Sequence, residues 1–320
     1  MFMKIIYDIG KIKRKFVRPI AAIGVFDGLH RGHRYLIKKA VHEARLIRGT
    51  SVVMTFFPHP VHVLNPRADL PFLVPLPQRL KLIAGLKVDT CIVVRFTKRF
   101  SNLSPEDFVD KYLIQTLRPK EMFVGRGFRF GKDRRGDADF LKKNLRQINC
   151  KVNILAPLTC ERKIVSSTRI RKFIAMGRLD EANQLLGRRV SIFGKVVSGD
   201  GRGRLLGFPT ANIHTLRQCL PPVGVYLAQI IYKKKIWKGM ANIGRRPSFK
   251  KDDNIHLEVH ILDFHKNIYG KEIEVIFLRK IRDEKKFPSQ GALIRQIRKD
   301  EKIARNFFKK FKASRSVSFA

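Results

Sequence analysis

The chain has 320 residues, 44% of them hydrophobic, and its 67 lysines and arginines outweigh its acidic residues to give a formal net charge of +41. This hydrophobic fraction excludes a disordered chain, and the length predicts two domains. No apolar run approaches the roughly 20 residues that a membrane helix needs, so we expect no membrane partner.

The chain begins with "MFMKIIYDIGKIKRKF", which has basic residues but no continuous apolar region. It predicts a first strand and a basic loop, not a secretory signal. The four cysteines, at positions 91, 150, 160 and 219, include no CxxC pair. They fit neither a zinc site nor a disulfide framework, so we expect a cytoplasmic protein.

Short β-branched runs alternate with helical patterns through the first half of the chain. The runs that predict strands are "PIAAIGVF", "SVVMTFF", "DTCIVVRF", "EMFVG" and "CKVNILAP". Residues 35–47 and 104–117 predict helices, the second with Ser104 as N-cap and Pro105 at its first position. This alternation predicts a parallel sheet covered on both faces, with ligands at the carboxyl ends of its strands.

From about residue 187 the pattern changes to strands separated only by turns. The predicted strands are "RVSIFGKVVSG", "GVYLAQIIY", "KIWKGMANIG", "HLEVHILDF" and "KEIEVIFLRKI". Because no helix is expected between them, they predict an antiparallel barrel or sandwich. An amphipathic helix over 289–311 follows, with a heavily basic outer face.

The turn after the strand "AAIGVF" has the composition of a phosphate site. Gly28 and Gly32 let the backbone approach a ligand closely, and the following helix directs its free N–H groups into the turn. His30 and His33 are spaced to face the same ligand and to stabilise charge on a reacting phosphoryl group. A metal-ligand pair, or two surface histidines, are the alternatives.

Two further segments add phosphate-binding groups. In "SSTRIR", Ser166, Ser167 and Thr168 offer hydroxyl and N–H groups, and Arg171 adds positive charge; a plain helix cap is the alternative. "GDGRGRLLGFPTANI", from 199 to 213, is not a Walker A motif, but its glycines can cradle phosphates, and it also reads as a long hairpin loop. Thr210 and Asn212 in it offer hard oxygen ligands for Mg²⁺.

The combination of motifs resembles known families over almost the whole chain. "GVFDGLHRGH", "FFPHP", "FRFGKDRRGD" and "SSTRIR" resemble the FMN adenylyltransferase half of prokaryotic bifunctional FAD synthetases, within the nucleotidyltransferase superfamily. "LPPVGVYLAQI", "GMANIGRRPSF", "LEVHILDF" and "IYGKEIEVIFLRKIRDEKKF" resemble riboflavin kinases in order and spacing. The resemblance implies a Rossmann-like α/β domain over 1–186 and an antiparallel β-barrel kinase domain with a terminal helix over 187–320.

The resemblance also implies roles for individual residues. Catalytic roles fall to Glu258, as the base that deprotonates riboflavin, and to His30 and His33. Phosphate or ATP binding falls to Gly24, Phe26, Asp27, Gly32, Ser166, Ser167, Thr168, Arg171, Gly203 and Gly207. Flavin binding falls to His59, Arg282, Glu284 and Phe287, and Mg²⁺ binding to Thr210 and Asn212. Glu258 alternates with Leu257 and Val259, so it projects from the opposite strand face.

The implied function is phosphorylation of riboflavin to FMN, then adenylylation of FMN to FAD, with ATP and Mg²⁺. The family usually carries an acid at the positions of Phe57 and Arg126, and an Asp or Asn at that of Gly127. These differences suggest an impaired adenylyltransferase, so an enzyme with riboflavin kinase activity only is one alternative. A polyanion-binding regulatory protein, suggested by the charge, is the other. Because the charges are spread along the chain with few aromatic residues between them, we do not expect nucleic acid to be a partner. The sequence indicates no oligomeric state.

Overall fold

The computed structural model describes residues 2–12, 16–161, 163–199, 201–245 and 255–311. They form two compact units. The first contains the described residues up to 70 together with 76–167, and the second contains 71–75 together with the described residues from 168 to 311. The boundary predicted at 186/187 falls at the end of the helix α8 (Leu179–Leu186), within the second unit.

The described residues of the first unit build a six-stranded parallel sheet in the order β1-β4-β3-β2-β5-β8. Its strands are β1 (Lys4–Tyr7), β2 (Ile20–Ile23), β3 (Ser51–Phe57), β4 (Thr90–Arg95), β5 (Glu121–Gly125) and β8 (Lys151–Leu155). Each coincides with a segment that the sequence predicted as a strand. Two small hairpins pair β6 (Arg129–Phe130) with β7 (Gly136–Asp137), and β9 (Thr159–Cys160) with β10 (Lys163–Ile164).

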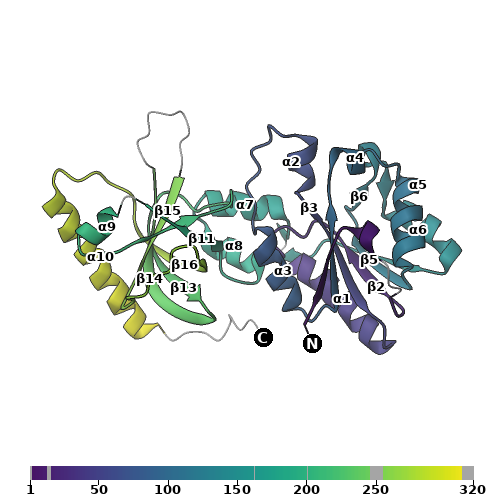
Figure 1. The fold of residues 1–320 in the computed structure, drawn as a ribbon, viewed down its shortest axis with the longest axis horizontal. Coiled ribbons are helices and arrows are strands. Elements are labelled where there is room, and N and C mark those ends of the chain that lie inside the picture. The colour runs from purple at the N-terminus through teal and green to yellow at the C-terminus, as the bar shows by residue number, and fades with distance from the viewer. Residues whose placement is uncertain (1, 13–15, 162, 200, 246–254, 312–320) are drawn as a thin grey trace. The chain divides into compact units, whose positions relative to one another are not determined.

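Helices cover both faces of this sheet, as predicted (Figure 1). On one face pack α1 (Arg31–Leu46) and α3 (Leu76–Ala84). On the other face pack α5 (Pro105–Phe108), the π-helix Val109–Leu117 and α6 (Ala138–Asn144). Ser104 caps α5 as predicted, since its side chain accepts a hydrogen bond from the backbone N–H of Asp107. The shorter helices of this unit are Ile9–Lys11, α2 (Pro60–Leu64), α4 (Lys98–Ser101), Lys132–Arg134 and Leu145–Ile148.

The described residues of the second unit form a closed barrel in the order β11-β12-β15-β14-β13-β16, with every neighbouring pair antiparallel. The strands are β11 (Ser191–Val197), β12 (Ala211–His214), β13 (Gly224–Tyr232), β14 (Lys235–Arg245), β15 (Ile255–Ile261) and β16 (Glu272–Arg282). The predicted barrel is therefore confirmed. The helices α7 (Ser167–Ala175) and α8 precede it, and Asn183 of α8 accepts a hydrogen bond from the Val190 N–H just before β11.

The expectation that no helix interrupts the barrel strands is wrong at α9 (Arg202–Leu205), a single turn between β11 and β12. Within the same glycine-rich stretch the structure also forms β12, where the sequence suggested only a loop. Glycine and proline just before it, at 207 and 209, hide so short a strand from pattern analysis. The terminal helix α10 (Gln290–Lys310) lies beside the barrel (Figure 1) and is capped by Ser289. It buries Ala304 and Phe308 in a cluster with barrel residues. None of the helices formed by the described residues is long and apolar enough to cross a membrane.

Candidate functional sites

The first site is the turn that joins β2 to α1. Its backbone is left-handed at Phe26 (φ 52°), Gly28 (φ 83°) and Leu29 (φ 38°). Such angles cost a non-glycine residue of the order of 1 kcal/mol or more, so they persist only where the surroundings enforce them. Here Phe26 and Leu29 are 2% and 1% exposed, which means that the core holds the turn in this shape. The turn is therefore prepared before any ligand arrives.

The two histidines of this turn lie together at the start of α1. Their rings stack with centroids 3.5 Å apart, and the His30 Nδ1 accepts a hydrogen bond of 3.3 Å from the His33 N–H. This bond caps the helix and fixes the His30 ring, whose Nδ1 therefore carries no proton. The Phe26 ring meets His33 edge-on at 5.3 Å. The pair thus faces the positive end of the helix dipole, where a phosphate binds favourably.

The predicted partners of this turn divide between the two units. In the first unit, the Ser167 hydroxyl donates a hydrogen bond of 2.8 Å to the carbonyl of Asp27, and Ser166 is half-buried beside it. Asp27 itself is 3% exposed. Thr168 and Arg171 belong to the second unit, where the Arg171 Nε donates to the Pro71 carbonyl at 2.7 Å.

The carboxyl ends of β3 and β5, the two neighbours of β2, carry the three positions at which the sequence analysis expects a departure from the family pattern. Phe57 ends β3 and is 40% exposed, and Arg126 and Gly127 follow β5 and are exposed. A Cβ at Gly127 would meet no atom within 4 Å. His59 is buried, and its Nδ1 caps α2 by accepting from the Val61 N–H. A ligand at the turn would have these residues beside it.

The second site is organised by strand register in the barrel. Glu258 on β15 pairs with Asn212 on β12 at one side and with Asn242 on β14 at the other. Directly paired residues share a sheet face, so one carboxylate lies between two amides. The neighbours Leu257 and Val259 point the other way and are 1% and 0% exposed, which confirms the predicted alternation.

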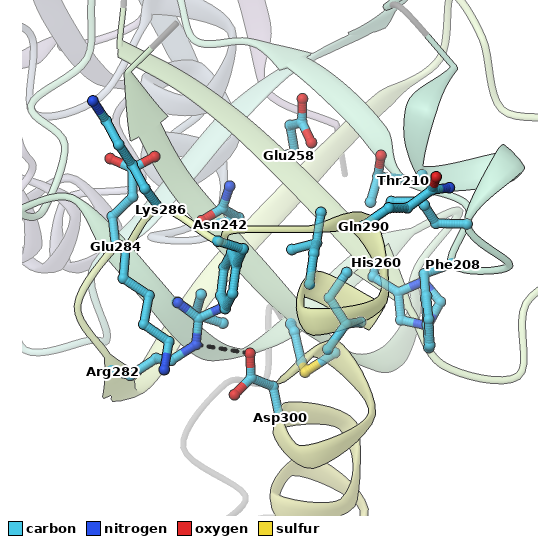
Figure 2. Close-up of a pocket in the computed structure, with 18 of the residues that line it drawn as sticks. Phe208, Thr210, Asn242, Glu258, His260, Arg282, Glu284, Lys286, Gln290 and Asp300 are labelled. Atoms are coloured by element: carbon cyan, nitrogen blue, oxygen red, sulfur yellow. Dashed lines mark hydrogen bonds and ion pairs between the residues drawn. The ribbon is translucent and has the colours of Figure 1, made fainter. Parts of the chain in front are cut away.

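These residues line a cavity of about 850 Å³. Figure 2 shows Glu258 and Thr210 toward one side of it and the Arg282–Asp300 ion pair toward the other. The predicted site residues that the cavity brings together are Gly203, Thr210, Asn212, Glu258, Arg282, Glu284 and Phe287. Gly207 has a φ of 84° in the same loop but is not among the lining residues. The volume suits a ligand of the size of a nucleotide or a flavin.

The donors on the Glu258 side of the cavity fit a hard cation. Thr210 and Asn212 supply a hydroxyl and an amide oxygen, which are ligand types that Mg²⁺ accepts together with water and phosphate oxygens. The loop is shaped around them. A Cβ at Gly203 would lie 2.9 Å from the Thr210 Oγ1 and 2.5 Å from the Phe208 carbonyl oxygen, and a Cβ at Gly199 would collide with the Asn212 amide.

The opposite side of the cavity is built by the end of β16 and by α10. The Arg282 Nε donates to the Asp300 carboxylate at 2.9 Å, and the Arg282 guanidinium lies 5.7 Å from the centroid of the Phe287 ring. The Glu284 carboxylate occupies the space beside Gly244, where a Cβ would lie 2.6 Å from its Oε1. The terminal helix therefore forms part of the pocket wall.

Among the lining residues that were not predicted from the sequence are Asn242, His260 and Asp300. Asn242 alternates with Ala241 and Ile243, the same pattern that places Glu258 on the strand face opposite Leu257 and Val259. His260 follows Glu258 by two positions on the same face, and its Nδ1 is 2.9 Å from the Pro209 carbonyl oxygen. Asp300 is 2% exposed on a helix full of charges, and the sequence contains no signal that singles it out.

Family models match both halves of the chain. The model described as FAD synthetase matches residues 13–169, and the model described as riboflavin kinase matches residues 186–308. The helices α7 and α8 lie almost wholly between these two ranges. The two matches follow the order of the two candidate sites along the chain.

Several known proteins are similar over nearly the full length. The bifunctional riboflavin kinase/FMN adenylyltransferase of Listeria monocytogenes is 41% identical, covering 92% of this chain and 94% of its own. The protein of the same name from Escherichia coli K12 is 38% identical, with 90% and 92% covered. A crystal structure from Streptococcus pneumoniae, described as a macrolide-efflux protein, has a TM-score of 0.81 and 32% identity, covering 96% of this chain and 99% of that one.

Proposed function

The chain belongs to the bifunctional riboflavin kinase/FMN adenylyltransferase family, and we propose that its two sites act in series on one flavin. The second unit phosphorylates riboflavin to FMN with one ATP. The first unit joins FMN to the adenylyl group of another ATP, giving FAD and pyrophosphate. ATP and flavins are therefore the substrates.

In the kinase step, Glu258 acts as the general base. The terminal ribityl hydroxyl of riboflavin forms the new bond to the γ-phosphorus, the bond to the bridging oxygen breaks, and ADP leaves. The proton of the hydroxyl passes to the Glu258 carboxylate, which Asn212 and Asn242 flank. Thr210 and Asn212 would hold Mg²⁺, which when bound neutralises charge on the ATP phosphates. The backbone around Gly203 and Gly207 binds those phosphates.

The flavin of the kinase occupies the side of the cavity near the end of β16. Arg282, Glu284 and Phe287 are its proposed contacts. Phe287 offers an aromatic face to the isoalloxazine ring, and Arg282 and Glu284 offer a donor and an acceptor to its polar edge. The support is that all three line one cavity with Glu258.

In the adenylylation step, the FMN phosphate attacks the α-phosphorus of ATP. No protein nucleophile is required, because the attacking group is itself an anion. His30 and His33, with the backbone from Gly24 to Gly32, stabilise charge on the phosphates. Ser166 and Ser167 hold the leaving pyrophosphate, and His59 contacts the flavin. For Thr168 and Arg171 the same role stays a prediction from the sequence. The turn already held in shape by the core supports this assignment.

The observation that carries the kinase assignment is the register that sets Glu258 between two amides beside Thr210. Purified protein incubated with riboflavin, ATP and Mg²⁺, followed by separation of the flavins, tests the whole proposal. FAD is the expected product. FMN alone would favour a kinase-only enzyme, the second candidate, to which the exposed Phe57, Arg126 and Gly127 point. Unchanged riboflavin would favour the polyanion-binding alternative. The cytoplasmic location and the domain boundary at 186/187 stay predictions.

A further inference from the structure

Arg79 is a charged side chain in the core of the first unit that the proposed mechanism does not use. It lies on α3 and is 0% exposed. Its Nη1 donates to the Val25 carbonyl at 2.9 Å, and lies 3.3 Å from both the Thr55 hydroxyl and the Phe56 carbonyl. The Thr55 hydroxyl in turn donates to the same Val25 carbonyl at 2.9 Å.

This arrangement is unfavourable for folding alone. The Nε and Nη2 of Arg79 are buried with no hydrogen-bond partner among the described residues. Burial lowers the pKa of the Arg79 guanidinium, and the negative charge of Asp27 offsets part of that effect. A buried charge with incomplete hydrogen bonding destabilises a core relative to an apolar side chain of similar volume. The guanidinium therefore calls for an explanation other than stability.

The bonds of Arg79 end at the two strand termini that meet the proposed ligands. Val25 is the residue before the left-handed Phe26 of the phosphate turn, and Thr55 and Phe56 close β3 just before Phe57. One guanidinium thus links the nucleotide side of the site to the adjoining strand end. Its charge lies in the interior close to Asp27, where the low dielectric strengthens its field.

We propose that Arg79 is a positioning residue for adenylyl transfer, which holds the phosphate turn against the end of β3 and adds buried positive charge beneath the ATP phosphates. This role rests on the proposed binding of ATP at the turn. A lysine does not replace it, because its side chain is one bond shorter, so its ammonium falls short of the position from which Nη1 reaches the Val25 and Phe56 carbonyls.

The test uses the full chain with Arg79→Met and Arg79→Lys, and Ile83→Ala as a matched control. Ile83 lies one turn further along α3 and is also 0% exposed, and it packs in the same apolar cluster as Phe26 and Leu29. Its hydrocarbon side chain makes no hydrogen bond to the turn, so its loss tests packing without the charge. FAD formation from supplied FMN is measured with ATP and FMN varied separately, at a temperature at which each variant is folded. FMN formation from riboflavin in the same preparations reports the integrity of the second unit.

For Arg79→Met we expect kcat/KM for ATP in adenylyl transfer to fall about 100-fold, with the KM for FMN changed far less and kinase activity within about twofold. For Arg79→Lys we expect kcat/KM for ATP to fall more than about tenfold while the melting temperature stays close to that of the wild type. This variant therefore tests the proposed role even if Arg79→Met does not fold. Ile83→Ala should lower the melting temperature and leave kcat/KM within about threefold.

Two results would overturn the role. One is wild-type kinetics in Arg79→Lys and Arg79→Met. The other is a fall in kcat/KM for ATP in both variants that is no larger, for each degree of lowered melting temperature, than the fall in Ile83→Ala. A wild-type chain that makes no FAD would instead overturn the proposed adenylyltransferase, and this role with it. Wild-type FAD formation beside equally active Arg79 variants would overturn this role alone.

Discussion

Asp300 lies on α10, outside the barrel strands, and its replacement should weaken riboflavin binding in the barrel site. Its carboxylate accepts from the Arg282 Nε at 2.9 Å and from the Gln296 Nε2 at 2.8 Å. The side chains of Asp300 and Arg282 are 3% and 19% exposed, so Asp300→Ala leaves a mostly buried guanidinium without its carboxylate partner. Breaking a buried pair costs about 3–5 kcal/mol, and the partial exposure of Arg282 favours the lower end, about 3 kcal/mol. That corresponds to a fall in melting temperature of roughly 6–12 °C.

The chain provides both a probe and a control for this experiment. Its single tryptophan, Trp237, lies on β14 of the barrel, so its fluorescence reports unfolding of the second unit alone. Glu301→Gln alters the next acid along α10, whose ion pair with Arg305 is more exposed (22% and 43%), and should cost less than about 1 kcal/mol. Kinase assays at a temperature at which each variant is folded should show a raised KM for riboflavin only in Asp300→Ala. Equal melting temperatures for both variants, with equal KM values, would refute the reasoning.

Three further predictions follow from the sites and the core. Glu258→Gln should abolish FMN formation but spare conversion of supplied FMN to FAD, and His33→Ala should do the reverse; a folded variant lacking both activities would contradict this division. Gly127→Asp restores an acid where a Cβ meets no atom within 4 Å. It should raise FAD formation by up to about tenfold, about 1.4 kcal/mol, with the kinase rate as control. Burial raises the pKa of the Cys91 and Cys150 thiols to about 12 from 9.0. Since the unfolded thiols ionise first, urea titrations should show the unfolding free energy falling as pH rises from about 9 to 12, by up to about 1.4 kcal/mol per pH unit for each thiol, and less in Cys91→Ala.

The strands and the two-unit organisation were predictable because they depend on local periodicity, whereas the residues of the barrel site were predicted from the resemblance to riboflavin kinases. Alternation along β15 alone indicates that Glu258 leaves the core. Its two partners come from strands 46 and 16 residues away in sequence, and only the observed register pairs Asn212 and Asn242 with it. Pairing across a closed barrel is a property of the whole sheet, which is why Asn242 escaped notice while Asn212, in a recognisable motif, did not.

Charged groups buried by tertiary packing were the least predictable. Asp300 and Arg79 lie on helices that carry other charged residues, and charged residues on a helix are ordinarily exposed. Helical periodicity alone therefore does not distinguish these two from their exposed neighbours. Their burial arises from what the fold puts over them: the end of β16 for Asp300 and the ends of β2 and β3 for Arg79. The sequence motifs mark groups that touch ligands. They do not mark residues such as Asp300 and Arg79, which position the ligand-contacting residues.

The expected departures of the first unit from the family pattern, at Phe57, Arg126 and Gly127, lie among groups that would touch a ligand and not among the buried groups that hold the turn. The phosphate turn depends on buried contacts, through Val25 and Arg79, that the exposed Phe57, Arg126 and Gly127 do not make. The sequence analysis expects an acid at the positions of Phe57 and Arg126 and an Asp or Asn at Gly127, and all three lie at the ends of the strands on either side of β2, outside the turn itself. Their effect should therefore fall on the flavin substrate and not on ATP. A chain altered in this way keeps the nucleotide half of the reaction intact, so the adenylyltransferase need not have been lost with its acids.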